Sequence, residues 1–255
     1  MNVRKEVKTT LDEEFQSVIW KIEIDSANNL IAVETRSAES HTATLSAYNY
    51  LTGVCYFKEL SIEAGWHWHL DRVYSEFVLL YGYTAPSSPE HKGIIAIDIN
   101  SGKVCWQIFH LTLTEVSNKG IIAYNPLLQS KKPILLDIKN GNQITDFNGE
   151  FTPVVRDVSF PEMMTTSMEK AAFLPANIAG IVAYAKVNSK ECYSFHILEN
   201  GSYIQYLIIT GNGEVLKKEI LASGIQKLNP EAFFTSGHAV FAVKGNNRRV
   251  LACLL

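Results

Sequence analysis

The sequence has few cysteines, and their spacing excludes the common metal motifs. Four cysteines, Cys55, Cys105, Cys192 and Cys253, are scattered along 255 residues, and none belongs to a C-x-x-C pair. The C-x-x-C spacing is typical of zinc sites and redox motifs, and its absence means that neither is indicated. We expect reduced thiols that pack as small buried hydrophobic side chains, as in a cytoplasmic protein.

The sequence also lacks a basic cluster, a long apolar run and a leader segment. It carries 23 basic and 26 acidic residues, a formal net charge of −3, which indicates no attraction to nucleic acid or to an anionic membrane. No window approaches the roughly 18 uninterrupted apolar residues of a membrane-spanning helix. The charged N-terminus, MNVRKEVKTTLDEEF, has no apolar core of a signal peptide. We therefore expect a cytoplasmic protein that binds neither nucleic acid nor membrane.

Recognisable catalytic motifs are lacking as well. Ser236-Gly237-His238 has no strand–turn–helix context for a nucleophilic serine, and no helix follows Gly211-Asn212-Gly213 to complete a phosphate-binding loop. We predict no catalytic residue and no cofactor from these motifs.

What the sequence does contain is a clear β-hairpin. An apolar run over residues 93–97 ends at Asp98, turns through Asn100-Ser101-Gly102 and returns as Val104-Cys105-Trp106-Gln107-Ile108. Two β-prone runs around a short connection with glycine, which tolerates positive φ, are typical of a hairpin.

The strand-and-turn pattern of this hairpin recurs. Residues 47–53, 96–102 and 135–141 each end in a glycine that follows an Asx residue by four positions. An Asx side chain at such a place bonds local backbone and favours a turn. We therefore assign structural roles in these turns to a set of five residues: Gly53, Gly102, Gly141, Asp98 and Asp137.

These repeats predict an all-β fold, a β-propeller of four-stranded antiparallel blades. We count five blades in a single domain, 1–255, with an irregular insertion near 150–178; six blades result if residues 150–221 hold two degenerate ones. The final segment offers strands only at 225–228, 233–243 and 249–255, one short of a blade. We expect a strand near residues 6–10 to complete that blade and so to leave no open sheet edge.

Part of the repeat resembles a known family. Ala96-Ile97-Asp98, the Ser101-Gly102 turn and Trp106 are similar to the repeat of quinoprotein (PQQ-like) propellers. The resemblance implies that Trp106 packs between adjacent blades, with Phe57 a partial equivalent. It does not extend to a quinone cofactor. The composition also resembles that of uncharacterised bacterial propeller families of unknown function.

The most unusual local cluster is Trp66-His67-Trp68-His69-Leu70-Asp71. On a regular strand over 66–73, His67, His69 and Asp71 project to one side. Two imidazoles and a carboxylate can in principle bind a divalent metal, and H-x-H-x-D resembles part of the metallo-β-lactamase motif, although Arg72 stands where that motif continues with histidine. A polar strand facing a channel or loop is the simpler interpretation. We take His67, His69, Asp71 and Arg72 as candidate ligand-binding residues.

Two functions from different classes follow. The first is a non-enzymatic propeller that binds an unknown protein or small molecule at one end of its central channel. The second is an enzyme, a hydrolase or metal-dependent, with its site at the channel mouth, which requires a further acid, base or ligand from another blade. Because the repeats are clear and no catalytic constellation is recognisable, the sequence favours the binding module.

Overall fold

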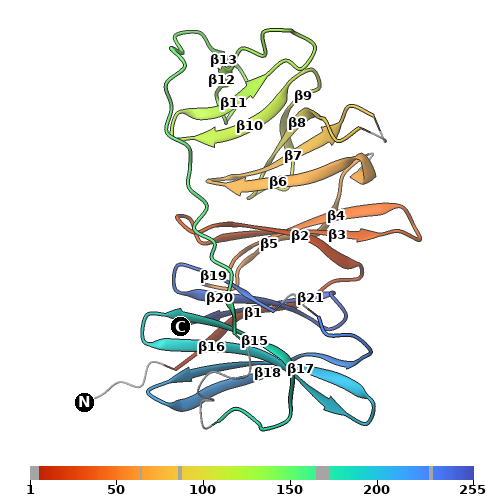
Figure 1. The fold of residues 1–255 in the computed structure, drawn as a ribbon. Helices are drawn as coiled ribbons and strands as arrows, with labels where there is room; N and C mark the ends of the chain where they lie inside the picture. Colours follow the sequence, from red (N-terminus) through yellow and green to blue (C-terminus); the bar gives the residue numbers. More distant parts are fainter. Residues whose placement is uncertain (1–5, 64, 86–87, 165–172, 230–231) are drawn as a thin grey trace. The chain divides into compact units, whose positions relative to one another are not determined.

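The computed structural model describes residues 6–63, 65–85, 88–164, 173–229 and 232–255. Within these ranges the strands form five antiparallel sheets, and the one helical element described is a 3-10 turn, η1 (Gly65–His67) (Figure 1). The predicted all-β class is confirmed. No helix in the described part of the chain has the length and apolar character needed to cross a membrane.

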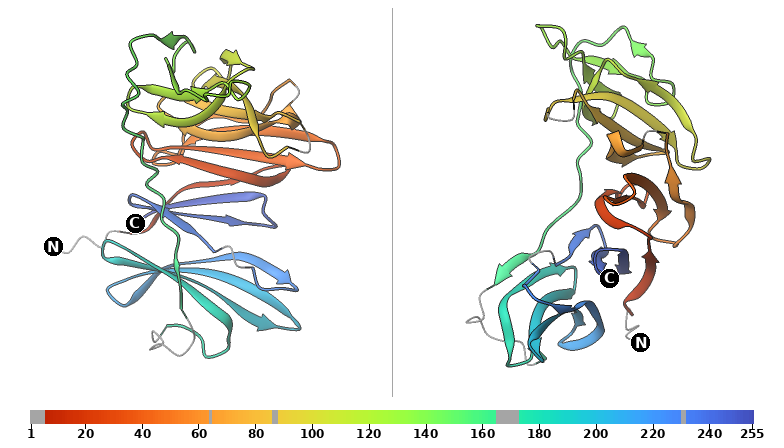
Figure 2. Two further views of the ribbon diagram at one scale, coloured as in Figure 1. Left: turned by 45° about the horizontal axis from the view of Figure 1, so that its top comes forward. Right: turned by 90° about the vertical axis from the view of Figure 1, so that its right-hand side faces the viewer.

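The sheets belong to two compact units, drawn from two further directions in Figure 2. The three-sheet unit comprises Ile19–Asn49 and Gly53–Asp157, and the two-sheet unit comprises Met1–Val18, Tyr50–Thr52 and Val158–Leu255. Each unit is described by itself below. That the whole chain forms a single domain stays a prediction.

In the three-sheet unit, each sheet is a meander of four consecutive strands. Sheet 1 consists of β2 (Val18–Asp25), β3 (Leu30–Ser37), β4 (Thr42–Asn49) and β5 (Cys55–Ser61). Sheet 2 consists of β6 (Trp68–Tyr74), β7 (Phe77–Tyr83), β8 (His91–Asp98) and β9 (Val104–Ile108). Sheet 3 consists of β10 (Thr112–Ser117), β11 (Gly120–Tyr124), β12 (Ile134–Leu136) and β13 (Gln143–Ile144).

The two-sheet unit begins with a five-stranded meander. Sheet 4 consists of β14 (Glu162–Met164), β15 (Ile178–Val187), β16 (Lys190–Glu199), β17 (Ser202–Gly211) and β18 (Glu214–Ile225). The strand β14 lies inside the region that we predicted to be an irregular insertion. Residues 165–172 of that region lie outside the described part of the chain.

Sheet 5 joins the two ends of the described chain. Its strand order is β1 (Lys8–Glu14), β21 (Arg249–Leu254), β20 (Ala239–Lys244) and β19 (Phe234–Ser236). The N-terminal strand is thus present, a few residues later than predicted, and it runs antiparallel to β21. The strand predicted over 233–243 is in fact two strands, because Gly237 adopts a φ of 55° and reverses the chain between them. No separate strand forms over 225–228, since β18 ends at Ile225.

The recurring turns share one hydrogen-bond pattern. In each, the glycine has a positive φ (78°, 66° and 72°) and its N–H donates to the carbonyl of the Asx residue four positions earlier, at 2.8–2.9 Å. The three pairs are Gly53 with Asn49, Gly102 with Asp98, and Gly141 with Asp137. The Asp98 and Asp137 carboxylates each accept a further backbone N–H at 2.7 Å, which fixes the turn locally.

Trp106 of sheet 2 packs against the corresponding turn of sheet 3. Its Nε1 donates to the carbonyl of Ile138 at 2.8 Å. A Cβ atom on Gly141 would lie 2.8 Å from two carbons of the indole ring, so only glycine allows this approach. One sheet earlier the contact is looser: a Cβ on Gly102 would lie 3.6 Å from the Phe57 ring.

The middle strands are apolar on both faces because both faces are covered. On β8, Ile95 and Ile97 belong to a core shared with sheet 1, whereas Ile94 and Ala96 belong to a core shared with sheet 3. Each fully buried isoleucine contributes about 1.5–3 kcal/mol relative to an exposed one. This burial explains why residues 93–97 show no apolar–polar alternation.

The four cysteines divide into two kinds. Cys192 and Cys253 are buried in the core between sheets 4 and 5, and burial raises the pKa of Cys192 to about 12. Cys55 and Cys105 are exposed, so the expectation of burial is wrong for them. They lie on the last strands of sheets 1 and 2, near the ends that follow the turns.

Candidate functional site

The candidate ligand-binding residues lie where sheet 2 begins. The strand predicted to start at Trp66 begins at Trp68, because residues 65–67 form η1, in which the Gly65 N–H donates to the carbonyl of Ile62 at 2.9 Å. His67 is exposed on this turn. It therefore does not share a strand with the other three candidates.

A β-bulge interrupts β6 at Asp71. Leu70 and Arg72 pair with adjacent residues of β7, so Asp71 is the extra residue. The bulge breaks the side-chain alternation of the strand. The prediction that His67, His69 and Asp71 project together from a regular strand is therefore wrong.

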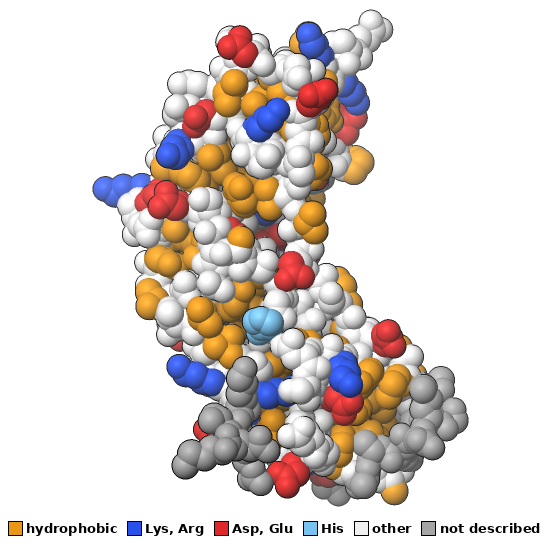
Figure 3. Space-filling model, turned by 90° about the vertical axis from the view of Figure 1, so that its left-hand side faces the viewer, with side chains coloured by type: hydrophobic (Ala, Val, Ile, Leu, Met, Phe, Trp, Pro, Cys, Tyr) orange, Lys and Arg blue, Asp and Glu red, His pale blue; other side chains and the backbone are white. Residues whose placement is uncertain are grey.

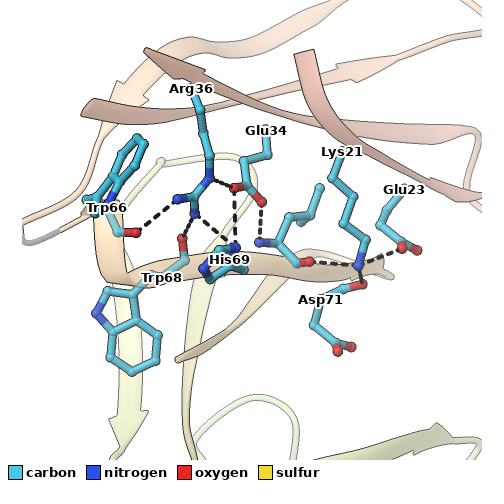
Figure 4. A network of polar contacts seen from close by, with 9 residues as sticks. Lys21, Glu23, Glu34, Arg36, Trp66, Trp68, His69 and Asp71 are labelled. Atoms are coloured by element: carbon cyan, nitrogen blue, oxygen red, sulfur yellow. Dashed lines mark hydrogen bonds and ion pairs between the residues drawn. The ribbon is translucent and has the colours of Figure 1, made fainter. Parts of the chain in front are cut away.

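Arg36 on β3 lies along the free edge of β6 (Figure 4). Its Nε donates to the Glu34 carboxylate, Nη1 donates to the carbonyl of Trp66 at 2.9 Å, and Nη2 donates to the carbonyl of Trp68 at 2.6 Å. Nη2 also donates to Nδ1 of His69 at 3.1 Å. The guanidinium thus uses four of its N–H donors on one strand edge and one buried carboxylate.

Glu34 and Lys21 complete this edge. A Glu34 oxygen accepts the N–H of Leu70 at 2.7 Å. Lys21 Nζ donates to the carbonyls of Leu70 and Asp71 at 2.8 and 3.0 Å and to the Glu23 carboxylate at 3.1 Å. All three ammonium donors are therefore engaged.

These side chains hydrogen-bond to the backbone groups at the edge of β6, as a neighbouring strand would. Backbone groups at a sheet edge need partners when they are buried, and an unpaired one costs about 1–3 kcal/mol. The Glu34 and Arg36 side chains are only 1% and 7% exposed, and they hydrogen-bond to each other and to this edge. We call this set, Lys21, Glu34 and Arg36, the edge clamp. It fastens sheet 2 to sheet 1.

A second set of ion pairs links the first strands of sheets 2 and 3. Arg72 donates from Nε to Asp71 at 3.0 Å and from Nη1 to Glu115 on β10 at 2.7 Å. Arg156 lies 3.4 Å from the Glu23 carboxylate. Burial raises the pKa of Glu23, and the nearby cations Lys21 and Arg156 oppose that rise. Asp71 and Arg72 are thus bound into a structural network.

His69 belongs to a group of four aromatic rings in mutual contact, which we call the ring cluster: His69, Tyr81, Tyr83 and His91. The Tyr81 ring is stacked between His69 and His91, with centroids 5.3 and 3.8 Å away. Tyr83 meets the three others edge to face at 4.9–5.6 Å. The rings come from β6, β7 and β8 at one end of sheet 2, where Tyr83 pairs with His91.

Burial favours the neutral form of both imidazoles in the ring cluster. Burial, followed by the charge of Arg36, lowers the pKa of His69 from 6.5 to about 4. Burial also lowers the pKa of His91, against the opposing charge of Asp71. Because Arg36 donates to Nδ1 of His69, the single proton of this ring is on Nε2.

Exposed aromatic side chains surround this end of sheets 1 and 2. Trp20 is 64% exposed, Phe109 57% and Tyr83 40%. The Arg36 guanidinium lies 5.8 Å from the Trp20 ring and 5.0 Å from that of Trp66. Exposed aromatic rings such as these are enriched at binding surfaces. Figure 3 shows a different side, the one on the left in Figure 1, where hydrophobic side chains lie among basic and acidic ones.

The metal hypothesis lacks a ligand set. Among the described residues, no three His, Cys, Asp or Glu side chains are grouped closely enough to hold a metal ion. The H-x-H-x-D resemblance therefore has no coordinating counterpart in that part of the chain.

Sequence reasoning located His69, Asp71 and Arg72 but missed their partners. Tyr81, Tyr83 and His91 stand beside the loop between β7 and β8, and only the strand register brings them onto His69. Glu34 and Arg36 come from another sheet, although two charged residues inside the apolar strand 30–37 are a signal of a buried pair.

Comparison with solved structures gives distant similarities. One structure, described as "Structural and Mechanistic Analysis of Two Prolyl Endopeptidases: Role of Inter-Domain Dynamics in Catalysis and Specificity", is 10% identical with a TM-score of 0.33, over 94% of this chain and 50% of that one. Another, "Bifunctional GH43-CE Bacteroides eggerthii", is 10% identical with a TM-score of 0.31, over 96% of this chain and 34% of that one. This chain spans half or less of the length of either, and similarity this low is no basis for assigning an activity to it.

No curated protein matches the chain. Residues 24–106, which run from the end of β2 in sheet 1 to the middle of β9 in sheet 2, are similar to a family described as a domain of unknown function, DUF4905.

Proposed function

We propose that the five sheets are the blades of a β-propeller, closed by the pairing of β1 with β21, and that the chain is a non-enzymatic binding module. Its ligand, an unidentified small molecule or protein segment, binds at the end of sheet 2 that carries the ring cluster. Support for the propeller comes from the shared cores between consecutive sheets and from the repeated turn contacts.

The observation that carries the binding proposal is the ring cluster beside the hydrogen-bonded network of Lys21, Glu34 and Arg36. Rings from three strands converge at one end of a rigid sheet, and Tyr83 is exposed there. Ligand sites are characteristically lined by aromatic side chains with a few placed polar groups.

The same network argues for binding over catalysis. General acid–base catalysis needs a titratable group with access to a reacting atom. Here Nδ1 of His69 is occupied by Arg36, and Asp71 and Glu115 share Arg72. These groups maintain the architecture and orient the rings.

A thermal-shift screen of metabolites, oligosaccharides and peptides tests this proposal. A ligand of the ring cluster raises the Tm of the wild type and raises that of Tyr83→Ala much less. Phe160→Ala is the matched control, because Phe160 is an exposed aromatic residue (77%) of the two-sheet unit. Each stabilising compound is then recovered, and its molecular mass is measured by mass spectrometry.

We expect the compound to be recovered unchanged. Chemical turnover of a stabilising compound would overturn the non-enzymatic function. Stabilisation that is equal in the wild type and Tyr83→Ala would overturn the assigned location.

A further inference from the structure

The charge balance around the ring cluster indicates the kind of ligand that it accepts. Within the described residues, the edge clamp and the linked ion pairs contain four basic side chains (Lys21, Arg36, Arg72 and Arg156) and four acidic ones (Glu23, Glu34, Asp71 and Glu115). Their formal charges cancel. Binding of an ionic ligand depends on uncompensated charge of the opposite sign, and this set offers none.

The donors of the basic groups nearest the cluster are also engaged. Lys21 uses all three N–H donors on two carbonyls and Glu23. Arg36 uses four on Glu34, two carbonyls and His69. A carboxylate or phosphate ligand would have to break these bonds, and the backbone edge of β6 would lose its partners.

The groups that remain available match hydroxyl groups. A neutral imidazole is a donor at one nitrogen and an acceptor at the other, and a phenol is both at one oxygen. His91 and Tyr83 are such groups, with ring centroids 5.3 Å apart. The Tyr83 phenol also hydrogen-bonds with that of Tyr81, but a phenol oxygen has one donor and two acceptor sites and so keeps capacity for a ligand. A hydroxyl group of a ligand is likewise both donor and acceptor, so it can pair with either residue in either direction.

The exposed ring faces supply the apolar half of the contact. Tyr83 in the ring cluster and Trp20 beside Arg36 present flat apolar surfaces with polar tips. A sugar ring has the complementary construction, with a face of C–H groups and a rim of hydroxyls. Peptides and lipids lack that combination of a stiff apolar face and a dense hydroxyl rim.

We infer that the ring cluster binds a neutral carbohydrate, with the sugar ring on Tyr83 and its hydroxyls on His91 and the Tyr83 phenol. The inference rests on the proposed binding function and names its ligand class. We therefore expect uronic acids, sugar phosphates and positively charged amino sugars not to bind the ring cluster.

Isothermal titration with defined oligosaccharides tests the inference. The neutral probes are cellohexaose, xylohexaose and maltohexaose; the charged probes are a galacturonic acid oligomer and a glucosamine oligomer. The variants are Tyr83→Ala, Tyr83→Phe and His91→Ala, with Phe160→Ala as the control, and circular dichroism checks that each variant is folded. We expect a neutral probe to bind, with a Kd raised about tenfold in Tyr83→Ala and little changed in Phe160→Ala. Tyr83→Phe and His91→Ala each remove one hydrogen-bonding partner of the sugar, so each should raise the Kd by a smaller factor than Tyr83→Ala.

The possible results separate the inference from the proposed function. Failure of every neutral probe, or preference for a charged one, overturns the carbohydrate inference. If a non-sugar compound then shows Tyr83-dependent stabilisation in the thermal-shift screen, the proposed binding function stands without the carbohydrate inference. A neutral sugar that binds the wild type, Tyr83→Ala and His91→Ala equally overturns the site itself.

Discussion

Replacing Gly141 by alanine isolates the packing of Trp106 between sheets 2 and 3. At this glycine φ is 72°, and the added Cβ would lie 2.8 Å from two carbons of the indole ring. Gly102 provides the matched control, since it has the same place in the preceding turn and a φ of 66°, yet its Cβ would meet Phe57 and Leu60 at 3.6 Å, ordinary contact. The two substitutions share the backbone penalty and differ in the steric one.

The magnitudes follow from these distances. Placing alanine in the left-handed region costs about 1–2 kcal/mol at either site. Only Gly141→Ala adds overpacking, which costs about 1–3 kcal/mol, because the hydrogen bond from Trp106 to Ile138 prevents the indole from withdrawing. We therefore expect Gly102→Ala to destabilise by about 1–2 kcal/mol and Gly141→Ala by about 2–5 kcal/mol.

Urea unfolding followed by circular dichroism and tryptophan fluorescence measures the difference, with both probes compared because a chain of two units need not unfold in one step. A double-mutant cycle with Trp106→Leu checks the cause: the cost of Gly141→Ala should shrink when the indole is gone. Equal destabilisation by the two alanines, or no coupling to Trp106, would show that the Trp106 ring does not cause the extra cost of Gly141→Ala.

Three further predictions concern the edge clamp, the ring cluster and β1. Arg36→Met leaves the Glu34 carboxylate buried without its cationic partner and should lower the free energy of unfolding in urea by about 3–5 kcal/mol. Replacing the exposed Arg248 by Met is the control and should change that free energy little. A loss below about 1 kcal/mol for Arg36→Met would contradict the role of the edge clamp. The pKa of His69 is 6.5 in the unfolded chain and about 4 in the folded one, so on acidification the unfolded chain takes up the proton first, and the free energy of unfolding should decrease by at most about 3 kcal/mol between pH 6.5 and pH 4. His69→Gln should flatten that part of the plot of stability against pH. An unchanged plot would show that His69 is not the cause. Deleting residues 1–14 removes the partner of β21 together with the ion pair of Arg249 with Asp12, so it should lower the Tm and promote association through the open edge; a monomer of unchanged Tm by light scattering and calorimetry would contradict the role of β1.

The features that sequence reasoning predicted are those encoded locally. The turn at residues 98–102 was recognisable because Asp98 and Gly102 determine it within a few residues. The apolar run over 93–97 indicated a strand covered on both faces, as the two cores around β8 show. The exposed Cys55 and Cys105 went unrecognised, because cysteine at a strand end carries no periodic signal of its own.

The features that it missed depend on register and on contacts distant in the chain. The bulge at Asp71 is determined by the pairing of β6 with β7, and it redirects the side chains of a motif that reads as regular alternation. The clamp joins Arg36 to residues about thirty positions away. Neither a propensity nor a short motif contains that information, whereas the buried charge inside β3 is a signal that can be used.

The edge clamp and the ring cluster together explain why polar residues concentrate at the start of β6. Arg36 serves both, since it fastens the edge of β6 and fixes the tautomer of His69. A rigid backbone edge holds the rings in one arrangement, and preorganised groups bind a ligand with less loss of conformational entropy. In the proposed function, the structural and the binding roles are therefore coupled through the Arg36 side chain.

Histidine ring resonances report whether a ligand binds at the ring cluster. In a two-dimensional NMR titration with a compound that stabilises the wild type, the signals of His69 and His91 should shift in proportion to occupancy. His196 and His238, in the two-sheet unit, serve as internal controls and should stay in place. Shifts at His196 or His238 with His69 and His91 unmoved would contradict the account.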